Sequence, residues 1–287
     1  MSDPVASDSR GVSVIVPNYN GGRFLARCLD SLLAQTRTPL EILVVDGAST
    51  DNSLAVVETF GRRFASLRCV SERDAGPADA INKGLRQTTG PFVTWLNADD
   101  ALDPRALEFA MAEFAKDDSL SLVYGSVLNV TEDGAIMALN RGLKLPATDL
   151  GEFDFIPQAG AVFRRYEGLR LDASLEWGFD WELWIELAAR GEIRNIDRIV
   201  GYCIVKGQAG RKSDAVIPRR TLELARIARR HAPGFTFRVS LAYLTAMLGY
   251  ACSPMAVIDP RYHARIVRWA GRLNRLVRGR TEKGIML

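Results

Sequence analysis

Histidine is almost absent from this chain of 287 residues, which has only His231 and His263, both late in the sequence. A histidine that acts as the base in the core of the fold is therefore excluded. If the chain is an enzyme, a carboxylate is the expected proton acceptor.

Cysteine is also scarce, with four residues at positions far apart: Cys28, Cys69, Cys203 and Cys252. This spacing does not suggest a zinc site or a disulfide framework, so we expect a reducing compartment. Residues 1–10 are polar and lack the apolar core of a signal peptide. Together these absences predict a cytoplasmic protein.

Charge is unevenly distributed along the chain, although its net charge is only +3. Residues 216–287 hold 14 Lys/Arg and 3 Asp/Glu, whereas the rest of the chain holds 23 basic and 31 acidic residues. The hydrophobic content of 47% is enough for one large core with an appendage. We therefore predict two regions, residues 11–215 and residues 216–287.

Four apolar runs of strand length alternate with helical patterns in the first region. The runs are residues 12–16, 41–45, 67–71 and 91–96. Strands that alternate with helices favour a parallel sheet with right-handed crossovers. The sequence thus predicts an α/β fold: a Rossmann-like, mostly parallel sheet flanked by helices, with a helical extension at the C-terminus.

The later part of the first region is less regular. The pattern predicts a helix over 104–115, a strand from Leu120 with a hairpin turn at 132–134, and a strand over 158–163. We expect residues 143–155 to form an irregular loop that covers a ligand site, which the acidic residues described next indicate. An amphipathic helix follows, with Asp180 and Glu182 near its start.

Acidic side chains follow three of the predicted strands: Asp46, Asp74, and the adjacent pair Asp99 and Asp100. The carboxyl ends of parallel strands share one edge of a sheet, where open α/β sheets bind ligands. Adjacent carboxylates repel each other, and a hard cation such as Mg²⁺ or Mn²⁺, shared with phosphate oxygens, would compensate them. The alternative for Asp99 and Asp100 is a polar turn before the next helix.

Five motifs in this order resemble those of glycosyltransferase family 2. They are SVIVPNYN, VVDGASTDNS, DAINKG, WLNADD and FDWELW, and the resemblance runs over residues 12–207. It implies the GT-A fold and an inverting transfer of a sugar from a nucleotide diphosphate to an acceptor hydroxyl, with Mn²⁺ or Mg²⁺. We expect a UDP-sugar donor and a glycan or lipid-linked acceptor in cell-surface polysaccharide or glycolipid synthesis.

The resemblance also implies roles for individual residues. Tyr19 would lie against the nucleobase and Asp46 would accept hydrogen bonds from it. Asp99 and Asp100 would handle ribose and metal, and Asp180 would be the general base, with Glu182 as the neighbouring candidate. The nucleotide-binding set is Pro17, Tyr19, Asn20, Asp46, Ser49, Asp74, Lys83, Asn97, Ala98 and Asp99. Helix capping is the alternative role for Asp180 and Glu182.

Two departures from the family pattern leave other functions open. Asn97 replaces the first carboxylate of the acidic motif, and the stretch 202–208 lacks the histidine that family members often have. Lys206, Gln208, Arg211 or Lys212 would have to replace that histidine. One alternative is therefore a catalytically degenerate nucleotide-sugar-binding protein. A nucleotidyltransferase is another, although residues 17–22 contain no basic residue for a phosphate loop.

The second region predicts a membrane-associating segment. Residues 239–258 are uncharged, which favours a buried or interfacial helix over a membrane-spanning one. Residues 261–280 are expected to form a helix that carries seven arginines and no acidic residue. Such a helix is typical of binding to anionic lipid. A solvated helix and a nucleic-acid patch are alternatives, but we expect no nucleic-acid partner. We expect residues 235–280 to bind the inner face of the plasma membrane peripherally.

Deleting residues 261–287 should release the protein from anionic vesicles. The intact chain should bind such vesicles in low salt and dissociate as salt rises, because surface charge is screened within about 8–10 Å at moderate ionic strength. Vesicle flotation measures both. An intact chain that ignores anionic vesicles in low salt would assign these residues a structural role instead.

Overall fold

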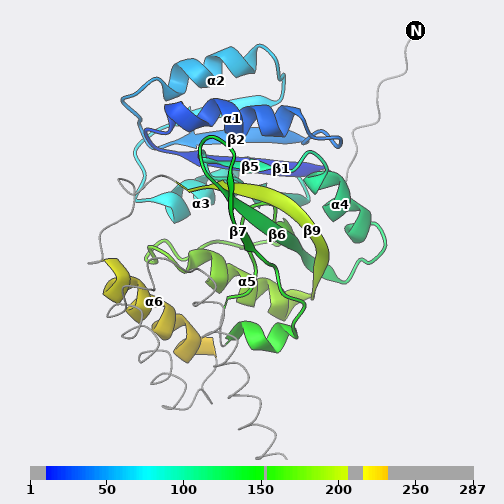
Figure 1. The fold of residues 1–287 in the computed structure, drawn as a ribbon. Helices are drawn as coiled ribbons and strands as arrows, with labels where there is room; N and C mark the ends of the chain where they lie inside the picture. Colours follow the sequence, from blue (N-terminus) through cyan, green and yellow to red (C-terminus); the bar gives the residue numbers. More distant parts are fainter. Residues whose placement is uncertain (1–10, 152–153, 206–215, 232–287) are drawn as a thin grey trace, which may run out of the picture. The chain divides into compact units, whose positions relative to one another are not determined.

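The computed structural model describes residues 11–151, 154–205 and 216–231. The chain divides into two compact units, Met1–Ile227 and Ala228–Leu287. The first unit contains every described strand, in one sheet (Figure 1). The predicted boundary at 215/216 precedes this division, because the start of the last described helix packs within the first unit.

The first half of the sheet matches the predicted alternation of strands and helices. Its four strands are parallel and lie in the order β3-β2-β1-β4. Their bounds are β1 Val12–Asn18, β2 Glu41–Asp46, β3 Leu67–Ser71 and β4 Phe92–Trp95. The helices between them are α1 Gly22–Leu33, α2 Ser53–Gly61 and α3 Pro77–Gln87. Helices α1 and α2 lie on one face of these strands and α3 on the other (Figure 1).

The second half of the sheet is mixed, so the prediction of a mostly parallel sheet holds only for the first half. Strand β8 pairs antiparallel with β4 and with β6, while β6 and β9 are parallel. The elements are β5 Asp100–Leu102, α4 Ala106–Phe114, β6 Leu120–Val130, β7 Ile136–Asn140, a 3₁₀ turn at Ala147–Gly151, β8 Val162–Arg164, α5 Phe179–Arg190, β9 Glu192–Ile204 and α6 Val216–His231.

Strands β5 and β9 were not predicted. Strand β5 has only three residues, and β9 mixes charged and apolar side chains over its thirteen. Asp100 pairs with Cys203 in this ladder. Ala98 and Asp99 form a turn, and from Asp100 on the chain continues as a short strand of the sheet.

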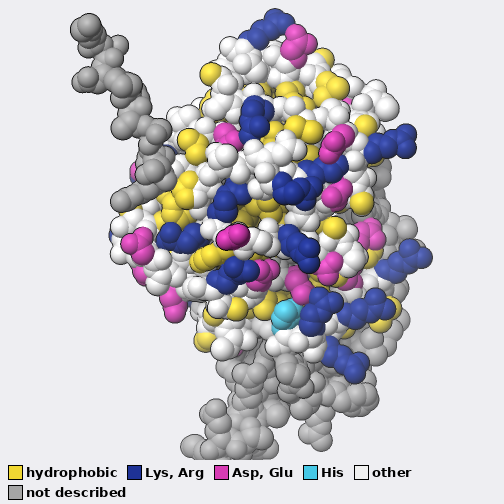
Figure 2. Space-filling model, turned by 180° about the vertical axis from the view of Figure 1, so that it is seen from behind, with side chains coloured by type: hydrophobic (Ala, Val, Ile, Leu, Met, Phe, Trp, Pro, Cys, Tyr) yellow, Lys and Arg dark blue, Asp and Glu magenta, His cyan; other side chains and the backbone are white. Residues whose placement is uncertain are grey.

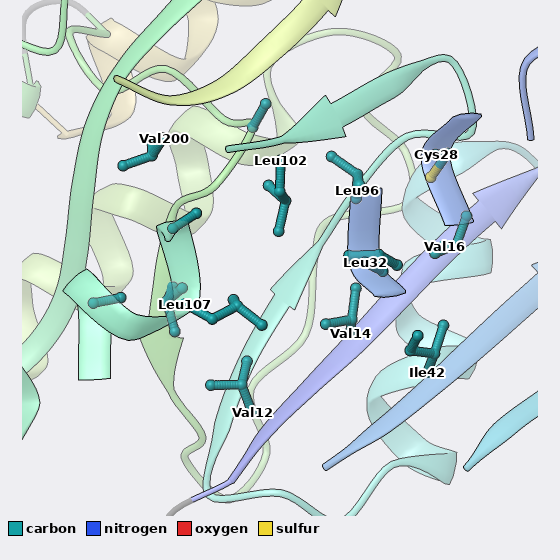
Figure 3. Packing of buried hydrophobic residues seen from close by; sticks show 14 of the residues in the cluster. Val12, Val14, Val16, Cys28, Leu32, Ile42, Leu96, Leu102, Leu107 and Val200 are labelled. Carbon is teal, nitrogen blue, oxygen red and sulfur yellow. The ribbon is translucent and has the colours of Figure 1, made fainter. Parts of the chain in front are cut away.

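Alternation along β1 divides the core between the two faces of the sheet. Val12, Val14 and Val16 belong to the cluster that packs with Leu32 of α1 and Leu107 of α4 (Figure 3). Full burial of side chains of this size stabilises by about 1.5–3 kcal/mol each. The apolar core thus fixes β1 under α1, which places the loop between them at the carboxyl edge.

The surface of the first unit carries both signs of charge. Figure 2 shows basic and acidic side chains interspersed over the face opposite to that of Figure 1. Charged residues of the first unit also form exposed ion pairs, such as Arg62 with Glu58 and Arg105 with Glu108. Exposed pairs of this kind contribute about 0–1 kcal/mol each, so they add little to the fold.

Several predictions concern the part of the chain that the structure does not describe. Residues 239–258 and 261–280, and the four candidates between Lys206 and Lys212, belong to that part of the chain. Within residues 11–151, 154–205 and 216–231, we find no helix that has both the length and the apolar character to span a bilayer. The described cysteines Cys28, Cys69 and Cys203 are free thiols.

A buried carboxylate joins the amino ends of three strands and makes stability depend on pH. Glu41 accepts hydrogen bonds from Ser13 Oγ (2.8 Å), Arg68 Nη2 (2.7 Å) and the amide of Thr89 (2.6 Å). Burial alone would raise the pKa of Glu41, but these donors lower it to about 2. A lowered carboxyl pKa adds stability above the unfolded-state value of about 4.3, and this stability is lost as pH falls towards 2.

Glu41→Gln should therefore flatten the loss of stability between pH 5 and pH 2. The group accounts for roughly 3 kcal/mol of the free energy of unfolding at neutral pH, if each pKa unit represents about 1.4 kcal/mol. Urea denaturation at a series of pH values measures this. Glu58→Gln, at an exposed pair on α2, is the control and should keep the wild-type slope. Equal slopes for Glu41→Gln and wild type would contradict the assignment.

Candidate active site

The loops that follow β1 and β2 are joined by a series of hydrogen bonds. The amide of Asn20 donates to Ser49 Oγ (2.8 Å), and Asn20 Oδ1 accepts from the amide of Thr50 (2.8 Å). The amide of Gly22 donates to Asp51 Oδ2 (2.9 Å). Asn20 adopts a left-handed φ of 50°, a conformation that asparagine tolerates better than most residues. The two loops therefore form one surface at the carboxyl edge of the sheet.

Asp46 lies at the centre of this surface. Its carboxylate accepts from Asn18 Nδ2 (2.7 Å), from Ser49 Oγ (2.5 Å) and amide (2.9 Å), and from Ser71 Oγ (2.7 Å). Burial would raise its pKa, but these donors, Ser49 first, lower it. Asp46 has no exposed surface. A direct bond from Asp46 to a nucleobase would thus require these loops to open.

Tyr19, Gly47 and Asp74 form an open face beside Asp46. The ring of Tyr19 is 68% exposed, and Asp74 is half-buried. A Cβ atom on Gly47 would lie 2.7 Å from Asp74 Oδ2 and 3.3 Å from Tyr19 Cδ2. Glycine at position 47 is therefore what leaves room between the aromatic ring and the carboxylate.

Asn97 has a fixed amide orientation. Gln158 Nε2 donates to the carbonyl oxygen of Trp95 (2.8 Å), which can only accept, so Gln158 Oε1 must face Asn97. Asn97 Nδ2 then donates to Gln158 Oε1 (3.3 Å) and to Asp100 Oδ2 (3.0 Å). Both amide hydrogens of Asn97 are used inward. Its Oδ1 remains as the atom that can accept a hydrogen bond from a ligand.

The two adjacent carboxylates differ in their surroundings. Asp100 is 6% exposed, and burial together with the charge of Asp99 raises its pKa to about 6, against the donors Asn97 and Cys203. Asp99 is half-buried and keeps solvent contact. Asp99 therefore faces outward, and Asp100 supports it from the interior.

This donor set fits a metal held jointly by protein and substrate. In the described part of the chain, no three His, Cys, Asp or Glu side chains gather into a metal cage. Mg²⁺ and Mn²⁺ are commonly held by one or two carboxylates plus substrate phosphates. Asp99 at the edge, with the Asp100 carboxylate behind it, meets that requirement.

The remaining members of the predicted nucleotide-binding set have mainly structural surroundings. Pro17 and Ala98 are buried, and Ser49 Oγ is used by Asp46, Asn18 and Asn20. Lys83 Nζ lies 3.0 Å from Glu72 and 3.8 Å from Asp79, and donates to the carbonyl of Arg73. The structure thus brings Tyr19, Asp74, Asn97 and Asp99 to the surface, with the others behind or beside them.

Asp180 lies in the first turn of α5, where the helix dipole favours its ionised form. Its Oδ1 accepts from the amide of Trp181 (2.9 Å). Desolvation nevertheless raises its pKa to about 6, against that amide and the charge of Arg220. Glu182 is two residues further along the same helical turn and is half-buried.

Asp154 is a second carboxylate beside Asp180. Although Asp154 is exposed, desolvation together with the charge of Asp180 raises the pKa of its carboxyl group well above the usual range. Arg220 of α6 opposes this effect at both carboxylates. A pair of carboxyl groups near one guanidinium is thus present at the start of α5.

Stacked aromatic rings fix α5 beside the strand that leads to Asn97. The rings of Trp95 and Trp184 lie 5.3 Å apart at 14° to each other, and Phe163 meets both edge-on. Trp184 is one helical turn after Asp180, and Trp95 immediately precedes Leu96 and Asn97. The helix of the predicted base and the strand of the acidic motif are therefore held together by direct packing.

Sequence reasoning missed Gln158, Asp154, Arg220 and Glu223. Asp154 lies in a stretch without periodicity, and Gln158 was predicted only as the first residue of a strand. Arg220 and Glu223 lie in a region assigned to the membrane by its charge. Only the tertiary contacts reveal their relation to Asn97 and Asp180. The one available signal was the single acidic residue, Glu223, among the arginines of α6.

The chain resembles proteins of known sequence family. Residues 13–169 match the family model described as Glycosyl transferase family 2. The hyaluronan synthase of Pasteurella multocida is 36% identical over 203 residues, which cover 68% of this chain and 20% of that protein. The chondroitin synthase of Escherichia coli is 27% identical over 204 residues, covering 69% of this chain and 29% of that protein. The chain therefore spans less than a third of the length of these synthases.

Solved structures share the fold at low sequence identity. A mannosyltransferase of Pyrobaculum calidifontis, in complex with GDP-Man and Mn²⁺, aligns with a TM-score of 0.63 and 20% identity over 97% of this chain and 89% of that chain. The TarS protein of S. aureus, in complex with UDP-GlcNAc, aligns with a TM-score of 0.61 and 18% identity over 90% and 79%. The predicted GT-A fold is confirmed by these similarities.

Gly47→Ala should weaken binding of nucleotide diphosphates by at least about tenfold, or about 1.4 kcal/mol. The new methyl group would meet Asp74 and the ring of Tyr19, and would close the space between them. Isothermal titration calorimetry measures the affinity. Gly61→Ala, at a helical position with nothing near the added atom, is the matched control and should bind as wild type. Unchanged affinity of Gly47→Ala would remove Tyr19 and Asp74 from the nucleotide site.

Proposed function

Since the chain belongs to glycosyl transferase family 2, we propose that it is an inverting glycosyltransferase with a UDP-sugar as donor. The acceptor is a hydroxyl of a glycan or of a lipid-linked sugar. The observation that most supports this is that hydrogen bonds join the β1 and β2 loops into one surface. Asp74 of the β3 loop lies beside Tyr19 on this surface, and Ala98 of the β4 loop, between Asn97 and Asp99, lies beside Gly21. Related structures bind UDP-GlcNAc or GDP-Man, which supports a nucleotide sugar as the donor.

The donor nucleotide occupies the open face beside Gly47. Tyr19 stacks on the nucleobase, and Asp74 accepts a hydrogen bond from the nucleotide. Asp46 acts from behind, because its oxygens are used to hold the two loops in place. Asn97 Oδ1 accepts a hydrogen bond from a ribose hydroxyl. An asparagine in place of the family's carboxylate therefore still provides a hydrogen-bond acceptor.

Asp99 is the protein ligand of the metal, and Asp100 supports it from the interior. Mn²⁺ or Mg²⁺, when bound, neutralises the diphosphate that leaves. A structural neighbour solved in complex with Mn²⁺ supports Mn²⁺ as the ion. The role of the missing histidine falls to Lys206, Gln208, Arg211 or Lys212, which lie outside the described residues.

Asp180 is the general base. Its carboxylate accepts the proton of the acceptor hydroxyl while the hydroxyl oxygen attacks the anomeric carbon from the face opposite the diphosphate. The bond from the anomeric carbon to the diphosphate oxygen breaks, so the configuration inverts. With a pKa of about 6, Asp180 is mostly ionised at neutral pH and still basic enough to accept this proton.

A catalytically degenerate nucleotide-sugar-binding protein is the second candidate, favoured by Asn97 and by the missing histidine. It would bind the donor but would neither hydrolyse nor transfer it. A nucleotidyltransferase is less well supported, because hydrogen bonds between Asn20, Ser49 and Thr50 occupy the loop that would have to surround phosphates. Turnover of the nucleotide-sugar donor with Mn²⁺ distinguishes the glycosyltransferase from the degenerate binding protein.

We assign the enzyme to the cytoplasmic side of the membrane, in synthesis of cell-surface polysaccharide or glycolipid. The relatives named as hyaluronan and chondroitin synthases support a polysaccharide product. Association with anionic lipid rests on residues 235–280, which lie outside the described residues. The division of labour between residues 11–215 and 216–287 stays part of this proposal.

Asp99→Ala and Asp180→Asn should fail in different ways. Asp99→Ala should lose Mn²⁺-dependent binding and turnover of the donor, because its carboxylate is the metal ligand. Asp180→Asn should bind the donor as wild type but transfer sugar about 10²–10⁴-fold more slowly. Thermal shift with nucleotide sugars, with and without Mn²⁺, measures binding, and release of nucleotide diphosphate measures turnover.

The pH dependence adds a second criterion. In wild type, kcat/KM should rise with pH up to about 6 and then level, because only ionised Asp180 accepts the proton. Asp180→Asn should lose this limb and should melt no lower than wild type at pH 7, since a raised carboxyl pKa costs stability once the group ionises. If Glu182→Gln shows this behaviour instead, Glu182 is the base. Full transfer by Asp180→Asn and Glu182→Gln would refute the mechanism.

A further inference from the structure

A carboxylate of α6 binds the residues that lead into α5. Glu223 Oε2 accepts from the amide of Glu176 (2.9 Å), and Glu223 Oε1 accepts from the amides of Trp177 (2.8 Å) and Gly178 (2.8 Å). Three consecutive backbone donors thus converge on one side chain that is remote in sequence. Bonds from amides to a charged acceptor are about twice as strong as neutral ones.

The position of these donors gives the contact its significance. Gly178 is the residue before the first turn of α5 and, as a glycine, it provides no capping side chain. The first amides of a helix have no partner within the helix, and negative charge there is favourable. From α6, Glu223 therefore satisfies the amide of Gly178 at the start of α5 and the two amides that precede it.

Close packing accompanies the hydrogen bonds. A Cβ atom on Gly178 would lie 2.4 Å from Ile227 Cδ1 and 3.1 Å from Leu224 Cδ2. Glycine at 178 thus lets α6 approach the backbone of the loop. The first turns of α6 are fitted to the start of α5 by shape as well as by charge.

Asp180 lies two residues beyond Gly178, in the same turn. The charged groups that face it are Asp154 from the preceding loop and Arg220 and Glu223 from α6. Arg220 favours the ionised form of Asp180, and Glu223 disfavours it. The carboxylate that binds the loop thus also acts on the charge of the residue that the loop presents.

We propose that Glu223 is a positioning residue for the transfer reaction, which holds residues 176–178 so that the Asp180 carboxylate meets the acceptor hydroxyl. This inference rests on the proposed function of Asp180. It assigns the first turns of α6 to the catalytic unit rather than to the membrane-associating region. A purely structural cap would stabilise α5 without any effect on the pH dependence of transfer.

The test compares three variants of the full chain. Glu223→Gln keeps the size but places an NH₂ group against an amide donor, and it removes the charge. Glu223→Asp keeps the charge but shortens the reach. Glu186→Gln, on the exposed side of α5, is the matched carboxylate-to-amide control. Circular dichroism melting first establishes that each variant is folded, and Glu223→Asp serves if Glu223→Gln is not.

Hydrogen exchange measured by mass spectrometry reports the contact directly. The peptide that contains residues 176–178 should exchange at least about tenfold faster in Glu223→Gln and Glu223→Asp than in wild type and Glu186→Gln. Exchange as in wild type would overturn the proposal, because the bonds would then not hold the loop. This readout is independent of catalysis, so it stands even if wild type shows no transfer and the proposed function fails.

Kinetics with UDP-sugar and Mn²⁺ then separate positioning from capping. In Glu223→Gln and Glu223→Asp, kcat for transfer should fall by up to about 100-fold, the scale for a misplaced catalytic group, with donor KM unchanged. The acidic limb of kcat/KM should move to lower pH in Glu223→Gln, which lacks the neighbouring negative charge, and should stay in Glu223→Asp. Faster exchange with unchanged kcat and an unchanged limb would show that Glu223 is only a cap.

Discussion

The carboxylate of Asp46 is the interaction on which the site depends. It accepts four hydrogen bonds, from Asn18 in β1, from Ser49 in the next loop and from Ser71 in β3. A buried carboxylate without such donors would destabilise the fold. Moving the loops away from Asp46 would remove donors from it, so its burial holds the loops in place. Tyr19 takes its exposed position from this arrangement. The open face beside Gly47 is thus a consequence of how one buried charge is satisfied.

The carboxylates of this protein divide into two groups by environment. Asp46 and Glu41 are surrounded by donors that lower their pKa, and both hold strands and loops together. Asp100 and Asp180 are desolvated with fewer donors, and their pKa is raised to about 6. The same side-chain type therefore has a lowered pKa where donors converge and a raised pKa where burial prevails, and a raised pKa suits the base role proposed for Asp180.

Much of the first half of the fold was predictable because its signals are local. Apolar runs bounded by turn residues identify β1 to β4, and parallel strands must bring Asp46 and Asp99 to one edge. The second half was not, because β5 is too short and β9 too mixed in composition to show a period. The donors around Asp46 were not predictable either, because they come from three separate segments of the chain.

The sequence alone determined the family, the parallel half of the sheet and the identity of the carboxylates, because these depend on residue type, spacing and order. The tertiary structure decided which atoms face a ligand. Gln158 fixes the orientation of Asn97, and Glu223 binds the loop before Asp180, through contacts between segments far apart in the chain. Such contacts leave no periodic trace in a sequence, since each requires only one polar side chain in a place that packing alone defines.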